Sequence, residues 1–499
     1  MKITAATSQL YTCAQVYALD AAAIASGIPG IQLMKRAGRA AFDLLLERYP
    51  AIELITVYCG AGKNGGDGYV LAALAAQKLL PVQIIQLTPA DRLSGEARIA
   101  YEYALQEGVK ILPFVEATVP TCGVIVDALL GIGLQGDVRP DFAEAIAQIN
   151  TSGLPVLAID IPSGLHGDSG ITQGAVVKAH LTITYIGVKR GLLTGRGPAV
   201  CGEVVLNDLD IPAEIYEQVS ASAEQLHLID LLELLPSRPA DAHKGDFGHV
   251  LIIGGDHGYG GAVIMAAEAA ARSGAGLVSV ATRPEHVTAL LARCPEVMAR
   301  GVLSGQELTQ LLVRPTVLVI GPGLGRSSWS EQLLQAAAQA GLPMVVDADA
   351  LNLIAEGRVL GHIQPRNHWL FTPHPGEAAR LLGTTTVDVN ADRFGSVAAL
   401  QQKLGGAVIL KGAGSLVLGD SAITGVVTDG NPGMATGGMG DVLSGIAGAL
   451  IAQGLAVEAA AQLAAAVHAS AGDLAAEKIG QRGLLATDLI PFVSQLLSE

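Results

Sequence analysis

Aromatic residues are scarce in this sequence: they make up 4% of its 499 residues, although 50% of all residues are hydrophobic. A hydrophobic core must therefore be built mainly from aliphatic side chains and alanine. Glycine, by contrast, occurs 61 times. This combination is typical of α/β domains, in which tight turns join strands to helices, and the length predicts more than one such domain.

Basic residues are also few. The chain has 31 Lys and Arg against 46 Asp and Glu, which gives a formal net charge of −15. This deficit argues against a nucleic-acid partner and against an anionic membrane surface, so we expect neither. Phosphorylated metabolites stay compatible with the charge, because backbone N–H groups at helix N-termini bind anions without net positive charge.

Cysteines and long apolar runs are sparse as well. The 5 cysteines lie far apart and form no C-x-x-C pair, so we expect free, buried thiols and neither disulfides nor a zinc site. The N-terminal segment lacks the apolar stretch of a secretory signal. The run Val442–Val457 is short for a membrane span and is expected to be a buried helix. We therefore expect a cytoplasmic protein.

The chain contains two series of alternating strands and alanine-rich helices. The first begins with LITVY and continues through VQIIQL, CGVIVDALLG, PVLAIDIPSG and LTITYIG; the second begins with GHVLIIGG. Such alternation predicts βαβ units and parallel sheets. Charge and proline cluster between the two series, around residues 215–240. We predict a first domain over residues 1–215, a linker over 216–226 and a second domain over 227–499.

The first glycine loop, YCGAGKNGGDGY (Tyr58–Tyr69), fits G-x-G-x-x-G. A dinucleotide-binding Rossmann unit also needs an acidic residue about 20 positions later, to hold the ribose. The next strand instead ends in Gln86 and Leu87. A phosphate loop of the G-K-[ST] type is excluded too, because Asn64 follows Lys63. Hydride transfer is therefore disfavoured.

Polar residues follow three strands of the first series. Asn64, Asp127 and Ser163 each lie at or just after a strand end. Because the carboxyl ends of parallel strands meet at one sheet edge, these oxygen atoms can converge on a hard cation. Asx-turns at loop starts are the alternative, and they explain one such loop better than three.

KNGGDG, DALLGIGLQGD and DIPSG resemble the signature loops of the YjeF N-terminal family, the NAD(P)H-hydrate epimerases. The resemblance implies a Rossmann-like α/β/α sandwich that interconverts the R and S epimers of NADHX and NADPHX. It implies that Asn64, Asp127 and Ser163 hold a potassium ion. The family usually has Asn where this chain has Lys63. The implied substrate-binding residues are Lys63, Asn64, Gly65, Gly66, Asp67, Gly131, Ile132, Gly133, Leu134, Gln135, Gly136, Asp137 and Asp160.

Epimerisation of the hydrated ring can proceed by loss of the hydroxyl group to an iminium-like cation and its return from the other face. This chemistry needs a carboxylate near the ring and a group that handles the hydroxyl proton. Asp160 is the catalytic candidate for the carboxylate. Lys189, in YIGVKRG, is a second candidate, although a solvated basic residue explains it equally well.

The second series carries glycine loops of its own, of which NPGMATGGMGD is the most informative. Gly437, Gly438 and Gly440 precede or open a helix that we expect to begin near Asp441. Free N–H groups at such a helix start bind a phosphate. Asp441 would then lie beside the phosphate as the general base for a hydroxyl group; a simple helix cap is the alternative.

TPHPGE and NPGMATGGMGD resemble the ribokinase-like superfamily, and within it the YjeF C-terminal family of ADP- or ATP-dependent NAD(P)H-hydrate dehydratases. The resemblance implies that the nucleotide, with magnesium, phosphorylates the ring hydroxyl and that phosphate then leaves. Two residues depart from the family pattern, Met439 and Ser415, at positions that chiefly offer backbone contacts. The implied substrate-binding residues are Ala262, Gly323, His374 and Asp441, with Asp441 catalytic. The implied nucleotide-binding residues are Lys411, Gly412, Ala413, Gly414, Ser415, Asn431, Gly433, Met434, Ala435, Thr436, Gly437, Gly438 and Gly440.

Together the two resemblances imply a bifunctional repair enzyme, an isomerase fused to a lyase. Its expected partners are NADHX, NADPHX and ADP or ATP, and we expect a homo-oligomer. One alternative is a ribokinase-like small-molecule kinase with an N-terminal regulatory ligand-binding module. Another is an N-terminal half that serves as a scaffold for partner proteins, which the intact Asn64, Asp67, Asp127 and Asp160 argue against.

Overall fold

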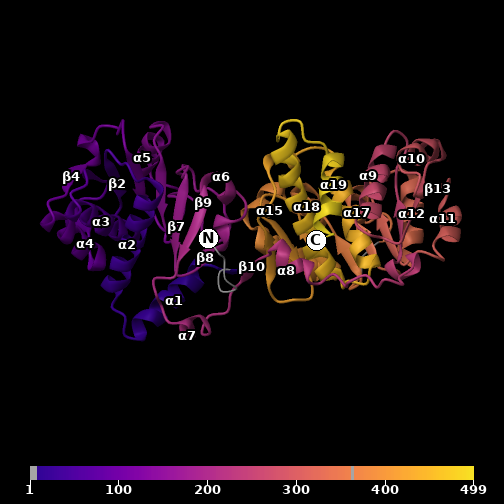
Figure 1. Ribbon diagram of the computed structural model, residues 1–499, viewed down its shortest axis with the longest axis horizontal. Helices are drawn as coiled ribbons and strands as arrows, with labels where there is room; N and C mark the ends of the chain where they lie inside the picture. Colours follow the sequence, from indigo (N-terminus) through magenta and orange to yellow (C-terminus); the bar gives the residue numbers. More distant parts are fainter. Residues whose placement is uncertain (1–7, 361–364, 499) are drawn as a thin grey trace. The chain divides into compact units, whose positions relative to one another are not determined.

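A computed structural model describes residues 8–360 and 365–498 of the chain. The chain divides into two compact units, Met1–Glu224 and Gln225–Glu499 (Figure 1). The division falls within the segment 216–226. Each unit is an α/β fold built on a largely parallel sheet, as the alternation of strands and helices predicts.

The first unit contains a 7-stranded parallel sheet in the order β4-β3-β2-β5-β6-β7-β9. The order reverses between β2 and β5, and doubly wound sheets bind ligands at such a switch point, beyond the carboxyl ends of the strands. The Rossmann-like prediction is therefore confirmed. The strands are β2 (Ile55–Cys59), β3 (Val82–Gln86), β4 (Lys110–Pro113), β5 (Val124–Ala128), β6 (Val156–Ile159), β7 (Leu181–Tyr185) and β9 (Glu203–Asn207). Beside them β1 (Gln9–Tyr11) runs parallel to β8 (Val188–Lys189).

Helices cover both faces of this sheet. Side chains alternate along β2, so Val57 packs into one core and Tyr58 into another on the opposite face. The first core includes Val70 of α3, and the second includes Phe142 of α5. The helices of the first unit are α1 (Cys13–Ala25), α2 (Gly30–Arg48), α3 (Lys63–Gln77), α4 (Gly95–Gln106), α5 (Pro140–Thr151), α6 (Gly197–Val200) and α7 (Ala213–Tyr216).

The second unit repeats this plan with an antiparallel extension. Its strand order is β13-β12-β11-β14-β15-β16-β17-β18-β19, and the order again reverses, here between β11 and β14. The strands up to β17 are parallel, whereas β18 and β19 are antiparallel to their neighbours. The strands are β11 (His249–Ile253), β12 (Leu277–Thr282), β13 (Met298–Gly301), β14 (Val317–Ile320), β15 (Met344–Val346), β16 (Trp369–Phe371), β17 (Ala407–Leu410), β18 (Ser415–Leu418) and β19 (Thr424–Val427).

The main core of the second unit lies between the sheet and an alanine-rich helix layer. Val250 and Ile252 of β11 pack there against Ala266 and Ile446. Helices of this layer include α8 (Leu228–Leu232), α9 (Gly260–Arg272), α10 (Val287–Arg293), α17 (Met439–Ala452), α18 (Val457–Ile479) and α19 (Ile490–Leu496). The other helices are α11 (Gly305–Leu311), α12 (Ser328–Gln339), α13 (Ala348–Ala355), α14 (Pro375–Leu382), α15 (Thr386–Ala391) and α16 (Arg393–Leu404).

Two expectations about the end of the chain need correction. Helix α17 begins at Met439 rather than near Asp441, because Gly438, at φ +92°, caps it in a left-handed conformation. The run Val442–Val457 is not one buried helix, because α17 ends at Ala452 and α18 begins at Val457. Among the described residues, no single helix is long and apolar enough to cross a membrane. Helices α1 and α2 together reach the required length and apolar composition, but they form a pair bent by 119°.

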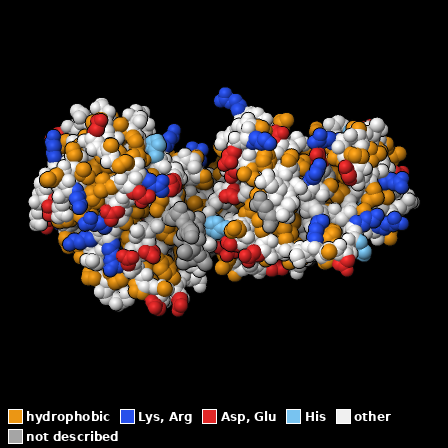
Figure 2. All heavy atoms as spheres, in the orientation of Figure 1, with side chains coloured by type: hydrophobic (Ala, Val, Ile, Leu, Met, Phe, Trp, Pro, Cys, Tyr) orange, Lys and Arg blue, Asp and Glu red, His pale blue; other side chains and the backbone are white. Residues whose placement is uncertain are grey.

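The cysteines are all free. Cys59, Cys201 and Cys294 are buried as expected, whereas Cys13 and Cys122 are partly exposed. On the face drawn in Figure 2, Lys and Arg side chains lie among Asp and Glu side chains.

Gly445 tests the packing of α17 on α9. A Cβ atom there would lie 2.2 Å from the carbonyl oxygen of Ala266, a backbone atom that cannot turn away. We expect Gly445→Ala to lower the free energy of unfolding of the second unit by about 1–3 kcal/mol, as overpacking does. Gly261, in α9, has open space around its Cβ position. Gly261→Ala should therefore be neutral or stabilising. Urea unfolding of both variants compares them, and equal stabilities would contradict the packing.

Candidate active sites

A cavity of about 610 Å³ lies at the carboxyl ends of β2, β5 and β6, next to the switch point of the first unit. This volume is in the usual range for small-molecule sites. The loops that the motifs identified form one wall. Helices α1 and α2 form another and supply Tyr17, Asp20 and Met34, which the motifs did not identify. These residues lie in ordinary helices, so no local pattern distinguishes them.

Most of the predicted substrate-binding residues line this cavity, but some glycines do not. Gly65 and Gly66 lie in the first turn of α3 and face the interior. A Cβ on Gly65 would meet the Gly60 carbonyl oxygen at 2.2 Å, and one on Gly66 would meet the Met34 Cε atom at 2.4 Å. Gly136, in the loop between β5 and α5, has a left-handed backbone conformation with φ +72°. The residues that do line it are Lys63, Asn64, Asp67, Gly131, Ile132, Gly133, Leu134, Gln135, Asp137 and Asp160.

The predicted oxygen ligands are close together beneath the cavity. The Asp127 carboxylate accepts hydrogen bonds from the Ser163 hydroxyl at 2.6 Å and from the Ser163 backbone N–H at 2.8 Å. Asn64 Nδ2 donates to the Leu130 carbonyl oxygen at 3.1 Å, and the Leu130 N–H donates to Ser163 Oγ at 2.8 Å. The Asn64 Oδ1 atom is buried, and no group in the described part of the chain donates a hydrogen bond to it. Such a group is costly unless another donor or a cation contacts it.

Asp160 is held in a strained backbone conformation, at φ +63°. Its carboxylate accepts a hydrogen bond from Lys189 Nζ, which also donates to Thr184 Oγ1 at 3.1 Å and to the Tyr185 carbonyl oxygen at 3.0 Å. The Lys189 side chain is only 1% exposed. The interpretation of Lys189 as a solvated residue is therefore wrong, and this lysine fixes Asp160 at the cavity wall.

Other carboxyl groups of the first site are buried. Burial, with the nearby Asp160 charge, raises the pKa of Asp67 well above its usual range. Burial also raises the pKa of Asp127 to about 6, although hydrogen bonds from Ser163 and Leu129 oppose it. This shift favours the protonated form of Asp67, the form that can donate a proton.

The second site is organised by an ion pair between Lys411 and Asp347. Lys411 Nζ lies 2.9 Å from Asp347 Oδ1, and the Ser444 hydroxyl donates to Asp347 Oδ2 at 2.8 Å. Burial alone would raise the pKa of Asp347, but Lys411 lowers it. Glu377 lies 4.0 Å from the same Lys411. The sequence motifs predicted a role for Lys411 but not for these partners, because Asp347 follows β15, Glu377 lies in α14 and Ser444 lies in α17, and they meet only in the folded chain.

Carboxyl groups outnumber Lys411 at this centre. Burial, together with the Asp347 charge, raises the pKa of Asp441 to about 7, although Lys411 opposes it. Burial raises the pKa of Glu377 to about 7 as well. Asp441 is thus close to half-ionised at neutral pH, which is the condition in which a general base works best.

Glycines are frequent among the predicted nucleotide-binding residues of this site. A Cβ on Gly440 would lie 3.2 Å from Lys411 Nζ, whereas the Cβ position of Gly437 is open. The predicted residues Lys411 to Ser415 form a loop with positive φ at Gly412 and Gly414. Buried Arg393 holds this loop by donating to the carbonyl oxygens of Leu410, Lys411 and Gly414. Asn431, at the start of the segment that includes Gly433, Met434, Ala435, Thr436 and Gly438, donates to Asp473 Oδ1 at 2.8 Å.

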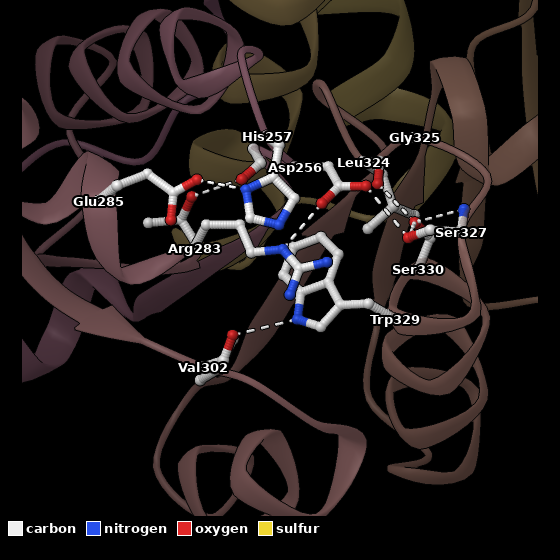
Figure 3. A network of polar contacts seen from close by, with 12 residues as sticks. Asp256, His257, Arg283, Glu285, Val302, Leu324, Gly325, Ser327, Trp329 and Ser330 are labelled. Atoms are coloured by element: carbon white, nitrogen blue, oxygen red, sulfur yellow. Dashed lines mark hydrogen bonds and ion pairs between the residues drawn. The ribbon is translucent and has the colours of Figure 1, made fainter.

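The predicted residues for the hydrated cofactor lie on neighbouring loops. Gly323 has φ +55°, and a Cβ there would lie 3.1 Å from the Ala262 Cβ atom. His374 caps α14, and its Nδ1 atom accepts from the Gly376 N–H at 3.0 Å. A polar network beside Gly323, centred on Asp256 and Arg283, was not identified by any motif (Figure 3).

Removing Lys411 should destabilise the second unit most at high pH. Lys411→Met leaves the buried Asp347 without its cation, which we expect to cost about 3 kcal/mol at roughly pH 8. In the wild type, Lys411 keeps Asp347 ionised above the unfolded-state pKa of about 4. In the variant, burial raises the pKa of Asp347, so this carboxyl takes up a proton and loses its buried charge as the pH falls. The deficit should therefore shrink towards about pH 4.5. Lys403→Met is the control, since within residues 8–360 and 365–498 Lys403 donates to the Leu381 carbonyl oxygen and pairs with no carboxylate. A deficit that is independent of pH in urea unfolding would contradict the pairing.

Comparison with known proteins finds a matching family for each of the two units. A family model for the YjeF-related protein N-terminus matches residues 30–191, and a model for NAD(P)H-hydrate dehydratase matches residues 250–494. The bifunctional NAD(P)H-hydrate repair enzyme Nnr of Coxiella burnetii is 49% identical over 489 residues, which cover 98% of this chain and 99% of that one. The enzyme of the same name from Escherichia coli is 42% identical over 478 residues, 95% of this chain and 90% of that one. A solved hypothetical protein of Streptococcus mutans is 29% identical with a TM-score of 0.50, over 55% of this chain and 98% of that one. The chain therefore belongs to the family of bifunctional NAD(P)H-hydrate repair enzymes.

Proposed function

We propose that each unit performs one step in the repair of hydrated NADH and NADPH, with the residues of its own switch point. Residues 1–215 would carry the epimerase, which interconverts R- and S-NAD(P)HX, and residues 227–499 the dehydratase. The observation that carries this proposal is the first turn of α17. There Asp441, with its pKa raised to about 7, lies in the same charge cluster as Lys411 and follows glycines whose N–H groups suit a phosphate.

In the dehydratase, Asp441 would take the proton from the ring hydroxyl of S-NAD(P)HX. The hydroxyl oxygen then attacks the terminal phosphorus of ADP or ATP, and AMP or ADP leaves. The lone pair of the ring nitrogen then forms a C=N bond, and phosphate leaves with the electron pair of the C–O bond. Loss of a proton from the adjacent ring carbon restores NAD(P)H. Lys411 and the N–H groups from Gly437 to Gly440 would balance the phosphate charge. Magnesium would enter with the nucleotide phosphates.

In the epimerase, the Asp160 carboxylate would face the cationic ring that forms when the hydroxyl leaves. Lys189 would hold this carboxylate in place from below. Asp67, whose pKa burial raises, would in its protonated form give its proton to the departing hydroxyl and take one back from the water that returns. Asp67 would end the cycle with a proton, as it began, and no phosphoryl group would be transferred. Epimerisation would therefore need no nucleotide.

Asn64, Asp127 and Ser163 would hold the potassium ion, and their chemistry fits one. Asn64 is connected through the backbone of Leu130 to Ser163, whose hydroxyl group contacts the Asp127 carboxylate, and the Asn64 Oδ1 atom has no hydrogen-bond partner among the described residues. Oxygen donors of mixed charge suit a hard cation. When bound, the ion would offset the buried charge of Asp127 and attract the diphosphate of the substrate.

The potassium assignment predicts a selective defect. Asp127→Asn keeps the shape of the side chain and removes its charge. We expect this variant to lose the rise in melting temperature that potassium gives the first unit relative to tetramethylammonium, and to lose most epimerase activity. Dehydration of pure S-NADHX should be unchanged. Asp141→Asn is the control for the loss of one negative charge, because Asp141 lies at the exposed start of α5. Loss of S-NADHX dehydration in the Asp127 variant would show that the sites are not separate.

The base assignment predicts a rate loss without a loss of nucleotide binding. Asp441→Asn should lower the rate of NADH recovery by about 10²–10⁴-fold, the usual contribution of a general base. The dissociation constant for ADP should change little. In the wild-type enzyme kcat/KM should fall as the pH drops through about 7, where Asp441 becomes protonated.

Glu377 has its pKa raised to the same value, so Glu377→Gln is the control for this pH dependence. The Glu377 variant should keep the pH step, and the Asp441 variant should lose it. An Asp441→Asn enzyme with more than about half of the wild-type turnover would exclude Asp441 as the base.

A small-molecule kinase with a regulatory first unit is the competing function. Incubation of the enzyme with mixed NADHX epimers, with and without ADP, separates the two. Repair predicts that NADH accumulates until both epimers are consumed, whereas a kinase predicts a stable phosphorylated product. The homo-oligomer and the cytoplasmic location remain predictions.

A further inference from the structure

Asp256 lies directly beyond the carboxyl end of β11 and joins the loops that follow three strands (Figure 3). Its Oδ1 atom accepts from Arg283 Nε, after β12, at 2.8 Å. Its Oδ2 atom accepts from the Ser327 hydroxyl, in the loop after β14, at 3.1 Å. One carboxylate therefore fixes the relative positions of these loops.

The backbone of Asp256 strengthens the same connection. Its N–H donates to the carbonyl oxygen of Gly323 at 2.7 Å, and its carbonyl oxygen accepts from the Tyr259 N–H at 2.9 Å. Gly325 closes in on the side chain, since a Cβ there would lie 2.9 Å from Asp256 Oδ2. These contacts hold the loop that contains Gly323 against the turn that leads to Ala262.

The ion pair is shielded from water and charged. Asp256 and Arg283 are each 13% exposed, and the guanidinium of Arg283 stacks on the Trp329 ring, 4.1 Å from its centroid. Burial alone would raise the pKa of Asp256, but Arg283 and the hydrogen bonds around it lower the pKa below its usual value. A shielded, stacked pair of this kind restrains geometry far better than an exposed one.

We infer that Asp256 is a positioning residue of the dehydratase: through Arg283 and Ser327 it holds the Gly323 loop against Ala262 in the geometry that receives NAD(P)HX. The inference rests on the proposed role of Gly323 and Ala262 in binding that substrate. The nucleotide side of the site belongs to other loops, at Lys411–Ser415 and Asn431–Gly440. Asp256 should therefore affect one substrate and not the other.

Asp256→Ala tests this separation in the full-length enzyme. We expect KM for S-NADHX to rise about tenfold, because loosened positioning weakens binding in the productive geometry. The dissociation constant for ADP and the epimerase rate should stay within about twofold of wild type. Asp256→Asn keeps an acceptor for Arg283 and should restore most of the affinity. Arg283→Lys, which keeps the charge but loses the planar stack, should raise KM in the same direction and covers a failure of the alanine variant to fold.

Glu285→Gln is the matched control. Glu285 pairs with His257 at 2.5 Å on the same two loops, but both side chains are exposed, at 47% and 70%. This variant should leave KM unchanged. Equal losses of S-NADHX and ADP binding in Asp256→Ala would overturn the positioning role, because they would indicate general loosening of the unit.

Ala262→Val separates failure of this inference from failure of the proposed substrate site. If Ala262→Val raises KM for S-NADHX and both Asp256→Ala and Arg283→Lys do not, the positioning role is wrong and the site assignment stands. If Ala262→Val leaves KM unchanged, Ala262 does not face the substrate and the inference falls with the assignment.

Discussion

A single steric constraint is repeated in both units: two loops at the switch point of the sheet touch through their backbones. A Cβ on Gly60, after β2, would lie 2.0 Å from the Leu129 carbonyl oxygen, after β5. A Cβ on Gly254, after β11, would lie 2.0 Å from the Pro322 carbonyl oxygen, after β14. These contacts require glycine, and they bring the polar residues of the flanking loops to one edge of each sheet. Both sites depend on this approach.

From this common plan the units arrange their charges differently. The first unit buries Lys189 against Asp160, so the carboxylate at the cavity is fixed beside its counter-ion, while burial raises the pKa of Asp67. The second unit surrounds Lys411 with more carboxyl groups than it can neutralise. Burial, together with the Asp347 charge, raises the pKa of Asp441 to about 7, which suits the role proposed for it as a base. One arrangement suits the exchange of a hydroxyl group, and the other suits its phosphorylation.

The sequence predicts the parallel sheets and the loops at their edges, because strand periodicity and glycine motifs are local signals. It does not separate glycines that face a ligand from those that allow packing: Gly65 and Gly66 belong to a motif but face Gly60 and Met34. Asp347 and Asp256 could not be assigned either, since their partners come from distant strands. Helix α17 begins earlier than expected because a left-handed Gly438 caps it.

Transfer of the terminal phosphoryl group to the ring hydroxyl is the central chemical claim, and the fate of that hydroxyl oxygen tests it directly. S-NADHX carrying oxygen-18 in the ring hydroxyl can be incubated with the enzyme and ADP, and the released inorganic phosphate analysed by mass spectrometry. Phosphorylation followed by C–O cleavage predicts that the label appears in the phosphate, one atom for each NADH formed. Label found in water instead would contradict the role proposed for Asp441 and the start of α17.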